Sequence, residues 1–314
     1  ALFFGAGNLI FPAALGQQAG DNVGWALLGF VLTGVGLPLL GVAAMGYSSC
    51  KDVEELASRV HPIYGLLYTI SLYLSIGPMF ATPRTGTVAY EIAIKPFAEG
   101  LSMNMNMEPI FLALFFGVSL WLSISPQKLV NRIGNILTPA LLLVILLLIV
   151  KSFITPLGDY AVPQPAYGDA PTAVLQGFLD GYNTMDGIAL VALAVSVVYA
   201  VRGLGYRGAA VSKTLAKAGL LSIIFEAIIY TALIALGVSS LAIMKPAENG
   251  GISLMAIINH YFGTFGSILT GVLVILAVFT TAVGLFSSFA HDMHLIFPKF
   301  SYNVWLSVSA IGSF

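Results

Sequence analysis

Two stretches, GAGNLIFP at residues 5–12 and DGYNTMDG at residues 180–187, decide the fold, because each interrupts a long apolar segment. Glycine-rich and polar sequence makes poor lipid-facing helix, and it is tolerated where the freed backbone groups line a cavity. Interrupted helices at corresponding positions in two halves of a chain are typical of transporters with inverted repeats. The two stretches therefore predict broken helices, the first and the sixth, that meet at the middle of a membrane.

The composition is that of a membrane protein: 58% of the residues are hydrophobic, 9% are charged and the mean hydropathy is +0.94. A soluble domain carries about 25% charged residues. The net charge of −1 favours neither a nucleic acid nor an acidic partner. The single cysteine, Cys50, excludes an internal disulfide and a cysteine-based metal site. The sequence therefore predicts an all-α protein embedded in a lipid bilayer.

Hydropathy, with glycine, proline and charge as boundaries, predicts about nine membrane segments. They are residues 1–18, 23–47, 63–94, 109–125, 133–153, 173–201, 215–240, 265–290 and 302–314. We expect a solvent-facing loop at 154–172. Because the chain opens and closes inside apolar segments, we expect a single transmembrane domain over 1–314 that is truncated at both ends.

The orientation follows from the distribution of lysine and arginine. If odd-numbered segments run outward, three basic residues lie on the outer side, namely Lys95, Lys151 and Lys245. Nine lie on the other side, namely Lys51, Arg59, Lys128, Arg132, Arg202, Arg207, Lys213, Lys217 and Lys299. This positive-inside bias predicts a cytoplasmic N-terminus.

An internal repeat is indicated by an offset of 199 residues, which pairs six identical residues between 55–82 and 254–281, among them His61 with His260 and Thr82 with Thr281. Apolar composition inflates such matches, so the repeat is only indicated. It makes helices one and six equivalent and divides the chain into a first repeat at about 1–153 and an incomplete second repeat at about 173–314. Since five helices separate the copies, we expect an inverted five-helix repeat.

The broken helices offer groups that suit a zwitterion. The outer half of helix one would begin near Ala6–Asn8, where free N–H groups and the positive end of the helix dipole suit a carboxylate. Carbonyls near Phe4 suit a cation, and the outer half of helix six, ending near Asp180–Gly181, offers carbonyls to an ammonium group. The alternative is that these glycines only permit close helix packing.

Helix eight carries two adjacent hydroxyls, Thr280 and Thr281, within an apolar run. Hydroxyl and carbonyl oxygens are the ligands that small hard cations prefer, so the pair is a candidate sodium site. The alternative is that each threonine donates back to a carbonyl of its own helix, as Ser and Thr in membrane helices commonly do.

Charged residues within membrane segments are functional candidates by default. Asp180 and Asp186 flank the predicted break in helix six; Asp186 would orient unwound backbone or bind a proton. Glu226 in helix seven would do the same or complete a polar network. Arg84 in helix three would take part in the site, or extend to the outer interface. No nucleophile–base arrangement and no phosphate loop stands out, so we do not expect an enzyme.

The motifs together resemble the bacterial branched-chain amino acid:cation symporter family. The resemblance rests on GAGNLIFP at 5–12, GPMFATPRT at 77–85, GYNTMD at 181–186 and TTAVGL at 280–285, and it covers essentially the whole chain. It implies the leucine-transporter type fold of the amino acid–polyamine–organocation superfamily. It also implies uptake of leucine, isoleucine and valine with sodium, or with protons in some members.

By this resemblance the sodium ion is held by five residues, through the carbonyls of Ala1, Phe4 and Ala277 and the hydroxyls of Thr280 and Thr281. The substrate lies against helices one and six, at Gly5, Ala6, Gly7, Asn8, Gly181, Tyr182, Asn183 and Thr184. One departure is that Leu9 and Ile10 precede Phe11-Pro12 where chloride-dependent relatives of this fold carry an arginine. Their outer gate is therefore not transferred.

The sequence thus predicts a symporter that works by alternating access in the bacterial cytoplasmic membrane. Sodium is its coupling ion, and we expect no cofactor, no nucleic acid and no obligatory protein partner. The first alternative is an importer of another neutral or hydrophobic solute on the same fold, coupled to protons through Asp186 or Glu226. A channel and a transport-dead amino acid sensor are alternatives from other classes.

Overall fold

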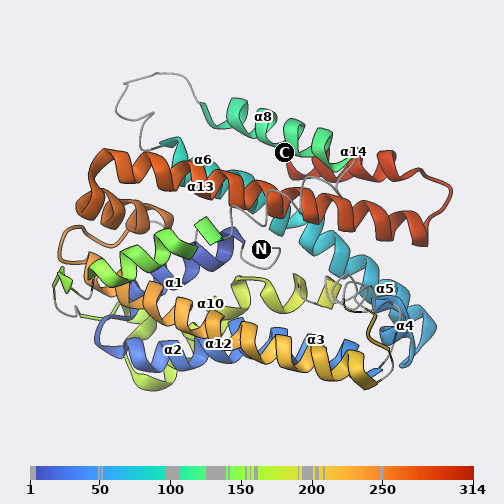
Figure 1. Ribbon diagram of the computed structural model, residues 1–314, viewed down its shortest axis with the longest axis horizontal. Coiled ribbons are helices and arrows are strands. Elements are labelled where there is room, and N and C mark those ends of the chain that lie inside the picture. The colour runs from blue at the N-terminus through green and yellow to red at the C-terminus, as the bar shows by residue number, and fades with distance from the viewer. Residues whose placement is uncertain are drawn as a thin grey trace.

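The computed structural model describes residues 5–48, 50, 52–95, 107–124, 139–140, 142–152, 154–155, 157–158, 162–189, 191–192, 201, 205–207, 209–247 and 250–314. Within these ranges every regular element is a helix (Figure 1). The α-helices are α1 (Ala6–Ala19), α2 (Val23–Val31), α3 (Leu37–Ser48), α4 (Val53–Ser58), α5 (Pro62–Leu74), α6 (Ala81–Ala93), α8 (Met107–Ser123), α10 (Ala170–Asn183), α12 (Ala209–Ser240), α13 (Gly250–Ile296) and α14 (Tyr302–Ser313). Two short 3₁₀-helices, η1 (Gly20–Asn22) and η4 (Pro165–Tyr167), and two π-helices, η2 (Leu32–Gly36) and η3 (Ser75–Met79), complete the set.

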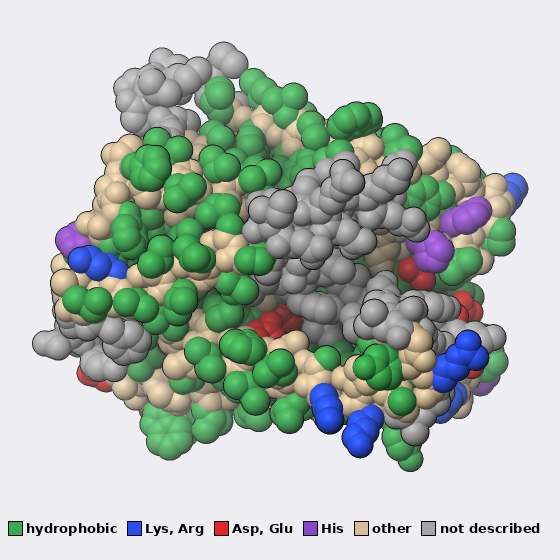
Figure 2. Space-filling model, in the orientation of Figure 1, with side chains coloured by type: hydrophobic (Ala, Val, Ile, Leu, Met, Phe, Trp, Pro, Cys, Tyr) green, Lys and Arg blue, Asp and Glu red, His purple; other side chains and the backbone are tan. Residues whose placement is uncertain are grey.

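Among the described residues, four helical stretches are long and apolar enough to cross a membrane. They are Gly7–Met45, Pro62–Ala93, Lys213–Ser240 and Gly250–Ile296. Hydrophobic side chains cover much of the face in Figure 2, and most of the Lys and Arg atoms lie toward the two ends of its long axis. The predicted class, an all-α multi-pass membrane protein, is therefore confirmed. The count of nine segments and the inverted repeat stay predictions.

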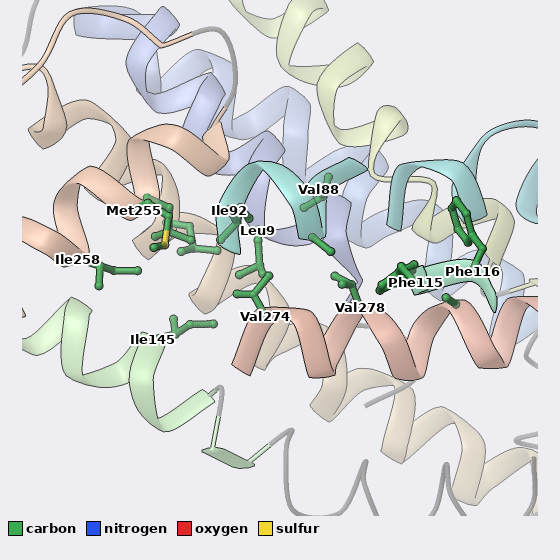
Figure 3. Packing of buried hydrophobic residues seen from close by; sticks show 14 of the residues in the cluster. Leu9, Val88, Ile92, Phe115, Phe116, Ile145, Met255, Ile258, Val274 and Val278 are labelled. Carbon is green, nitrogen blue, oxygen red and sulfur yellow. The ribbon is translucent and has the colours of Figure 1, made fainter. Parts of the chain in front are cut away.

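Helix α1 lies between two groups of helices (Figure 1). It packs on α12 and α10 on one side and on α13 and α6 on the other. Figure 3 shows Leu9 of α1 inserted between Ile92 of α6 and Val274 of α13, and all three side chains are buried. Between helices in lipid, such packing stabilises through van der Waals contact rather than through transfer of apolar surface out of water.

Close approach between α2 and α10 depends on glycine. A methyl group on Gly29 would lie 2.0 Å from the Val174 carbonyl oxygen, and one on Gly177 would lie 2.0 Å from the Ala26 carbonyl oxygen. Only residues without a side chain allow the two backbones to touch in this way. This contact fixes the position of α10, which leads into the predicted break of helix six.

A third membrane segment is interrupted, which the sequence analysis did not predict. In the span Pro62–Ala93, α5 passes into η3, and Gly77 has the non-helical angles φ −86° and ψ −121° before α6 begins at Ala81. Pro78 has no N–H to donate, and the Thr82 hydroxyl donates to the freed Ile76 carbonyl at 3.0 Å. The Gly-Pro pair breaks this helix at the middle of its span.

Helix α13 begins fifteen residues before the predicted segment 265–290. Residues 250–262 form a helix that turns into the long span at Gly263, whose φ is +64°. Leu254, Ile257 and Ile258 on this extension are buried. A run of 13 residues is too short to read as a span, so the sequence pattern did not separate this helix from a loop.

The described residues of the link 154–172 are mostly exposed, as predicted, but part of the link contacts the helices. Gln164 donates its backbone N–H to the Gln18 carbonyl at 2.8 Å. Tyr167 is fully buried and its hydroxyl donates to the Asp180 carboxylate of α10. The link therefore joins the end of α1 to α10, and its many prolines did not reveal this contact.

Candidate functional site

Helix α1 begins at Ala6, within the range Ala6–Asn8 that was predicted for the start of the outer half of helix one, and the break itself stays a prediction because it falls on residues outside the described ones. Gly5 is extended, with φ −95° and ψ −172°, and α1 begins at Ala6. The Gly5 N–H donates to the side-chain oxygen of Asn8 at 3.1 Å. Because the first N–H groups of a helix have no acceptor within the helix, the start of α1 at Ala6 and Gly7 presents donors. Ala1 and Phe4 lie outside the described residues.

The break in helix six is present, but it lies later than predicted. Helix α10 continues through Asp180 and Gly181 and ends at Asn183. Met185 then has a φ of +66°, the only positive φ of a non-glycine residue in the part of the chain that the structure describes. Helical geometry resumes at Asp186. The backbone therefore turns at Thr184–Met185, in a conformation that costs about 1–2 kcal/mol for a residue with a Cβ.

Two residues that were assigned to this break have other roles. Gly181 permits close packing, since a methyl group there would lie 2.3 Å from the Thr33 hydroxyl of η2. Asp180 accepts hydrogen bonds from Tyr167 and, at 3.2 Å, from Gln176. Both donors precede Asp180 in the chain, whereas the break follows it. Close helix packing, the alternative for these glycines, therefore holds for Gly181.

The start of α1 and the break in helix six meet beside Gly7. A methyl group on Gly7 would lie 3.0 Å from the carbonyl oxygen of Thr184 and 3.3 Å from Nη1 of Arg84. Nη1 of Arg84 donates to the Asn183 carbonyl at 2.5 Å. The guanidinium lies over the ring of Phe11, 5.1 Å from its centroid. Arg84 therefore points to the start of α1 and the end of α10, and its depth relative to the outer interface stays a prediction.

A cluster of polar side chains joins α1, the part of helix six after the break, and α12. The side-chain amide of Asn8 donates to both carboxylate oxygens of Asp186, at 3.1 and 2.9 Å, and to the Tyr230 hydroxyl at 2.5 Å. Tyr230 in turn donates to Asp186 at 2.6 Å and lies 3.1 Å from Oε1 of Glu226. Asn8, Asp186 and Tyr230 are buried. Both acidic candidates, Asp186 and Glu226, thus lie in one network.

Tyr230 is a site residue that the sequence analysis missed. It follows Glu226 by four residues on α12, and residues four apart share one face of a helix. This spacing was the available signal.

Of the remaining candidates on helix six, Thr184 is buried and its hydroxyl donates to the Gly181 carbonyl at 2.8 Å. Its oxygen also accepts the Asp186 N–H at 3.4 Å. Tyr182 and Asn183 have exposed side chains. At this break the backbone carbonyls, rather than the side chains of Tyr182 and Asn183, face helix one.

On α13, both candidate threonines donate to the same carbonyl of their own helix. Thr280 and Thr281 lie 2.7 and 3.2 Å from the Ala277 carbonyl oxygen. Back-bonding is therefore present, as the alternative stated. The start of helix one lies next to this pair, because a methyl group on Gly5 would lie 3.6 Å from Cγ2 of Thr281.

Apolar spans around interrupted helices whose backbone groups and buried polar side chains converge define a membrane transport protein of the solute carrier type. The family model described as "Branched-chain amino acid transport protein" matches residues 1–314, and the chain belongs to this family. This is a family of transport proteins rather than of enzymes.

Bacterial relatives are similar over 96–100% of this chain. The branched-chain amino acid permease BraB of Bacillus subtilis is 42% identical over 317 residues, which cover 100% of this chain and 70% of the permease. The permease BrnQ of the same organism is 43% identical, with 96% of this chain and 68% of the permease covered. BrnQ of Lactobacillus delbrueckii subsp. lactis is 37% identical, with 100% and 71% covered.

Proposed function

We propose that this protein imports leucine, isoleucine and valine together with sodium by alternating access. The observation that carries the proposal is the meeting of the start of α1 and the break in helix six at Gly7 and Thr184. The relatives named as branched-chain amino acid permeases support the choice of substrate.

The charged groups of the substrate bind at the two breaks. Its carboxylate lies at the start of α1, where the N–H groups of Ala6 and Gly7 and the positive end of the helix favour an anion. Its ammonium group lies toward the Thr184 carbonyl and the Asp186 carboxylate. Of the residues predicted on helix six, Thr184 lies next to Gly7 of helix one, and the Asn183 carbonyl accepts a hydrogen bond from Arg84.

Sodium binds between the start of helix one and the threonine pair of α13. Because Thr280 and Thr281 use their protons on the Ala277 carbonyl, their oxygen lone pairs face outward and can bind a cation. Gly5 is close enough to Thr281 for one ion to contact both helices. In this way the ion links helix one to α13 and favours the state that accepts the substrate.

The overall arrangement proposed is the inverted five-helix repeat of the leucine-transporter type, in the bacterial cytoplasmic membrane with the N-terminus inside. The excess of basic residues on one side of the predicted segments supports this orientation. The breaks in helices one and six support the repeat, since inverted halves place their broken helices opposite each other.

Uptake of radiolabelled leucine into liposomes, with and without an inward sodium gradient, tests the proposal. We expect accumulation only with the gradient, competition by isoleucine and valine, and no competition by lysine or glutamate. Gly7→Leu should abolish uptake because its side chain fills the space at the breaks. Gly24→Leu is the matched control, since Gly24 has open space around it. Full uptake by Gly7→Leu would contradict the placement of the substrate.

A proton is the alternative coupling ion, and the contacts of Tyr230 favour it. The Tyr230 hydroxyl has one proton but lies within hydrogen-bond distance of both Asp186 and Glu226. The second contact becomes a hydrogen bond when Glu226 carries a proton of its own. Uptake driven by a proton gradient in sodium-free medium, and lost in Glu226→Gln, would establish proton coupling in place of sodium.

A further inference from the structure

The interruption of the third segment places Arg84 at the start of a new helix within the span Pro62–Ala93. Since η3 ends at Met79 and α6 begins at Ala81, Arg84 lies in the first turn of a new helix. Its backbone N–H donates to the Phe80 carbonyl at 3.3 Å. The side chain thus starts next to the break in its own span and extends to the start of α1 and the end of α10.

Three contacts fix the guanidinium. Nη1 donates to the Asn183 carbonyl at 2.5 Å, at the end of α10. The ring of Phe11 lies under the guanidinium carbon at 5.1 Å and holds its plane by a cation–π interaction. Nη1 also borders the space above Gly7, 3.3 Å from where a methyl group would stand. The group is therefore positioned over the first turn of α1.

Arg84 has more donors and more charge than these contacts use. A guanidinium carries five N–H donors, and Asn183 is the one hydrogen-bond acceptor it has among the described residues. Asp186 interacts with it by charge, but the Asp186 oxygens accept hydrogen bonds from Asn8 and Tyr230 instead. A cation within a membrane segment is costly unless an anion is paired with it.

We propose that Arg84 binds the carboxylate of the substrate directly. This inference rests on the proposed function, and it adds a side-chain partner to the backbone N–H groups of α1. A carboxylate that binds at the N-terminus of α1, beside rather than over Gly7, would reach both the first N–H groups of the helix and the N–H groups of the guanidinium that point away from Asn183. Because a planar guanidinium can bind both oxygens of a carboxylate at once, the site selects amino acids over amides and amines with the same side chain.

Calorimetric titration of the purified protein with leucine and with leucinamide tests this proposal. Hydrogen bonds to charged groups contribute about 1.5–3 kcal/mol, or about 10- to 100-fold in affinity. We expect the wild-type protein to bind leucine about 10- to 100-fold more tightly than leucinamide. In Arg84→Gln, the affinity for leucine should fall by a similar factor while the affinity for leucinamide changes little. The preference for leucine over leucinamide should therefore disappear.

Arg59→Gln is the matched control, because Nη2 of Arg59 also donates to a backbone carbonyl, that of Ser48 at 2.7 Å, outside the breaks. It should keep the wild-type preference. Arg84→Lys keeps the positive charge without the planar guanidinium, so it should retain part of the preference for leucine over leucinamide. This variant tests the proposal if Arg84→Gln does not fold. A full preference for leucine in either Arg84 variant, or an equal loss of both ligands, would overturn the assignment of Arg84. A wild-type protein that binds no branched-chain amino acid would overturn the proposed function itself.

Discussion

At the scale of single residues, the Tyr230 hydroxyl connects α1, helix six and α12. It accepts a hydrogen bond from the side-chain amide of Asn8 at 2.5 Å and donates one to the Asp186 carboxylate at 2.6 Å. Its ring packs edge-on against Phe30 of α2, with centroids 5.1 Å apart. A buried network of this kind orders its members when every group is satisfied, and it is costly when one partner is removed.

Removing this hydroxyl should therefore destabilise the protein. Tyr230→Phe keeps the ring packing but removes the hydrogen bonds of the hydroxyl to the buried Asn8 and Asp186, which costs about 1–3 kcal/mol. We expect a lower unfolding temperature in detergent and a lower rate of leucine uptake. Tyr64→Phe is the control, since Tyr64 is about half exposed and stacks on Tyr68. Equal unfolding temperatures for the two variants would show that the network contributes no stability.

Thr281→Ala should lower the affinity for sodium with little loss of folded protein. The variant loses one hydroxyl oxygen next to helix one, while the Ala277 carbonyl keeps its hydrogen bond from Thr280. The measurement is leucine uptake as a function of sodium concentration, and half-saturation should move to higher sodium. Ser287→Ala is the control, because Ser287 donates to its own helix at 2.7 Å two turns further along. Unchanged sodium dependence in Thr281→Ala would remove this sodium site.

At the scale of elements, sequence patterns predicted the breaks better than the contacts around them. Glycine and polar residues at mid-span indicated that helices one and six are interrupted, and the start of α1 was placed correctly at Ala6. The break in helix six was placed too early because Gly181 was taken as its cause. In the structure Gly181 makes room for Thr33, and the turn falls at Met185. A glycine that breaks a helix and one that packs against a neighbour are identical in a single sequence.

The same limit applies to tertiary contacts between distant segments. The position of Arg84 at the end of α10 depends on the break at Gly77 in its own span, and Gly77-Pro78 was read only as part of a family motif. Asp186 and Glu226 were singled out because charge within a membrane segment is costly. Both carboxylates lie within hydrogen-bond distance of the Tyr230 hydroxyl because of the way α12 packs against α1. No local sequence pattern predicts this packing.

The backbone turn at Met185 should respond in opposite directions to two substitutions. Glycine adopts a positive φ without strain, whereas a β-branched residue is strongly disfavoured there. We expect Met185→Gly to fold and transport at least as well as the wild type. Met185→Val should unfold at a lower temperature and lose uptake. Equal unfolding temperatures for the two variants would contradict the left-handed turn.

The N-terminus of α10 should be sensitive to acid. Asp169 accepts hydrogen bonds from the hydroxyl of Thr172 at 2.6 Å and from its backbone N–H at 2.9 Å. These contacts lower the pKa of Asp169 below its ordinary value of 3.8. A lowered pKa stabilises the folded state above the unfolded-state pKa, and this stability is lost as pH falls through the folded-state pKa.

Asp169→Asn removes the titrating group and keeps a residue that caps helices well. We expect the wild type to be the more stable protein at neutral pH and the difference in unfolding temperature to shrink as the pH falls below about 4. Thermal unfolding of both proteins over a series of pH values measures this. A difference that stays constant over the series would show that Asp169 does not contribute through its charge.

At the scale of the whole molecule, α1 lies between two groups of helices, with α12 and α10 on one side and α13 and α6 on the other. The close contacts differ in kind on the two sides. Toward α12 and helix six, Asn8 forms the buried polar cluster. Toward α13 and α6, the contact is an apolar surface centred on Leu9 (Figure 3). Apolar surfaces slide more readily than networks of hydrogen bonds, so the proposed movement between open states should occur on the side of α13 and α6.

This movement can be followed with one cysteine, because the chain has only Cys50, which Cys50→Ser removes. Asn183→Cys in that background places a thiol at the exposed end of α10, next to Arg84 and Gly7. Alternating access predicts that a membrane-impermeant maleimide added outside reacts faster with sodium alone and more slowly with sodium and leucine together. Gly24→Cys, in open space on α2, should react at one rate in all conditions. If Asn183→Cys also reacts at one rate in all conditions, access to the breaks does not alternate with sodium and substrate.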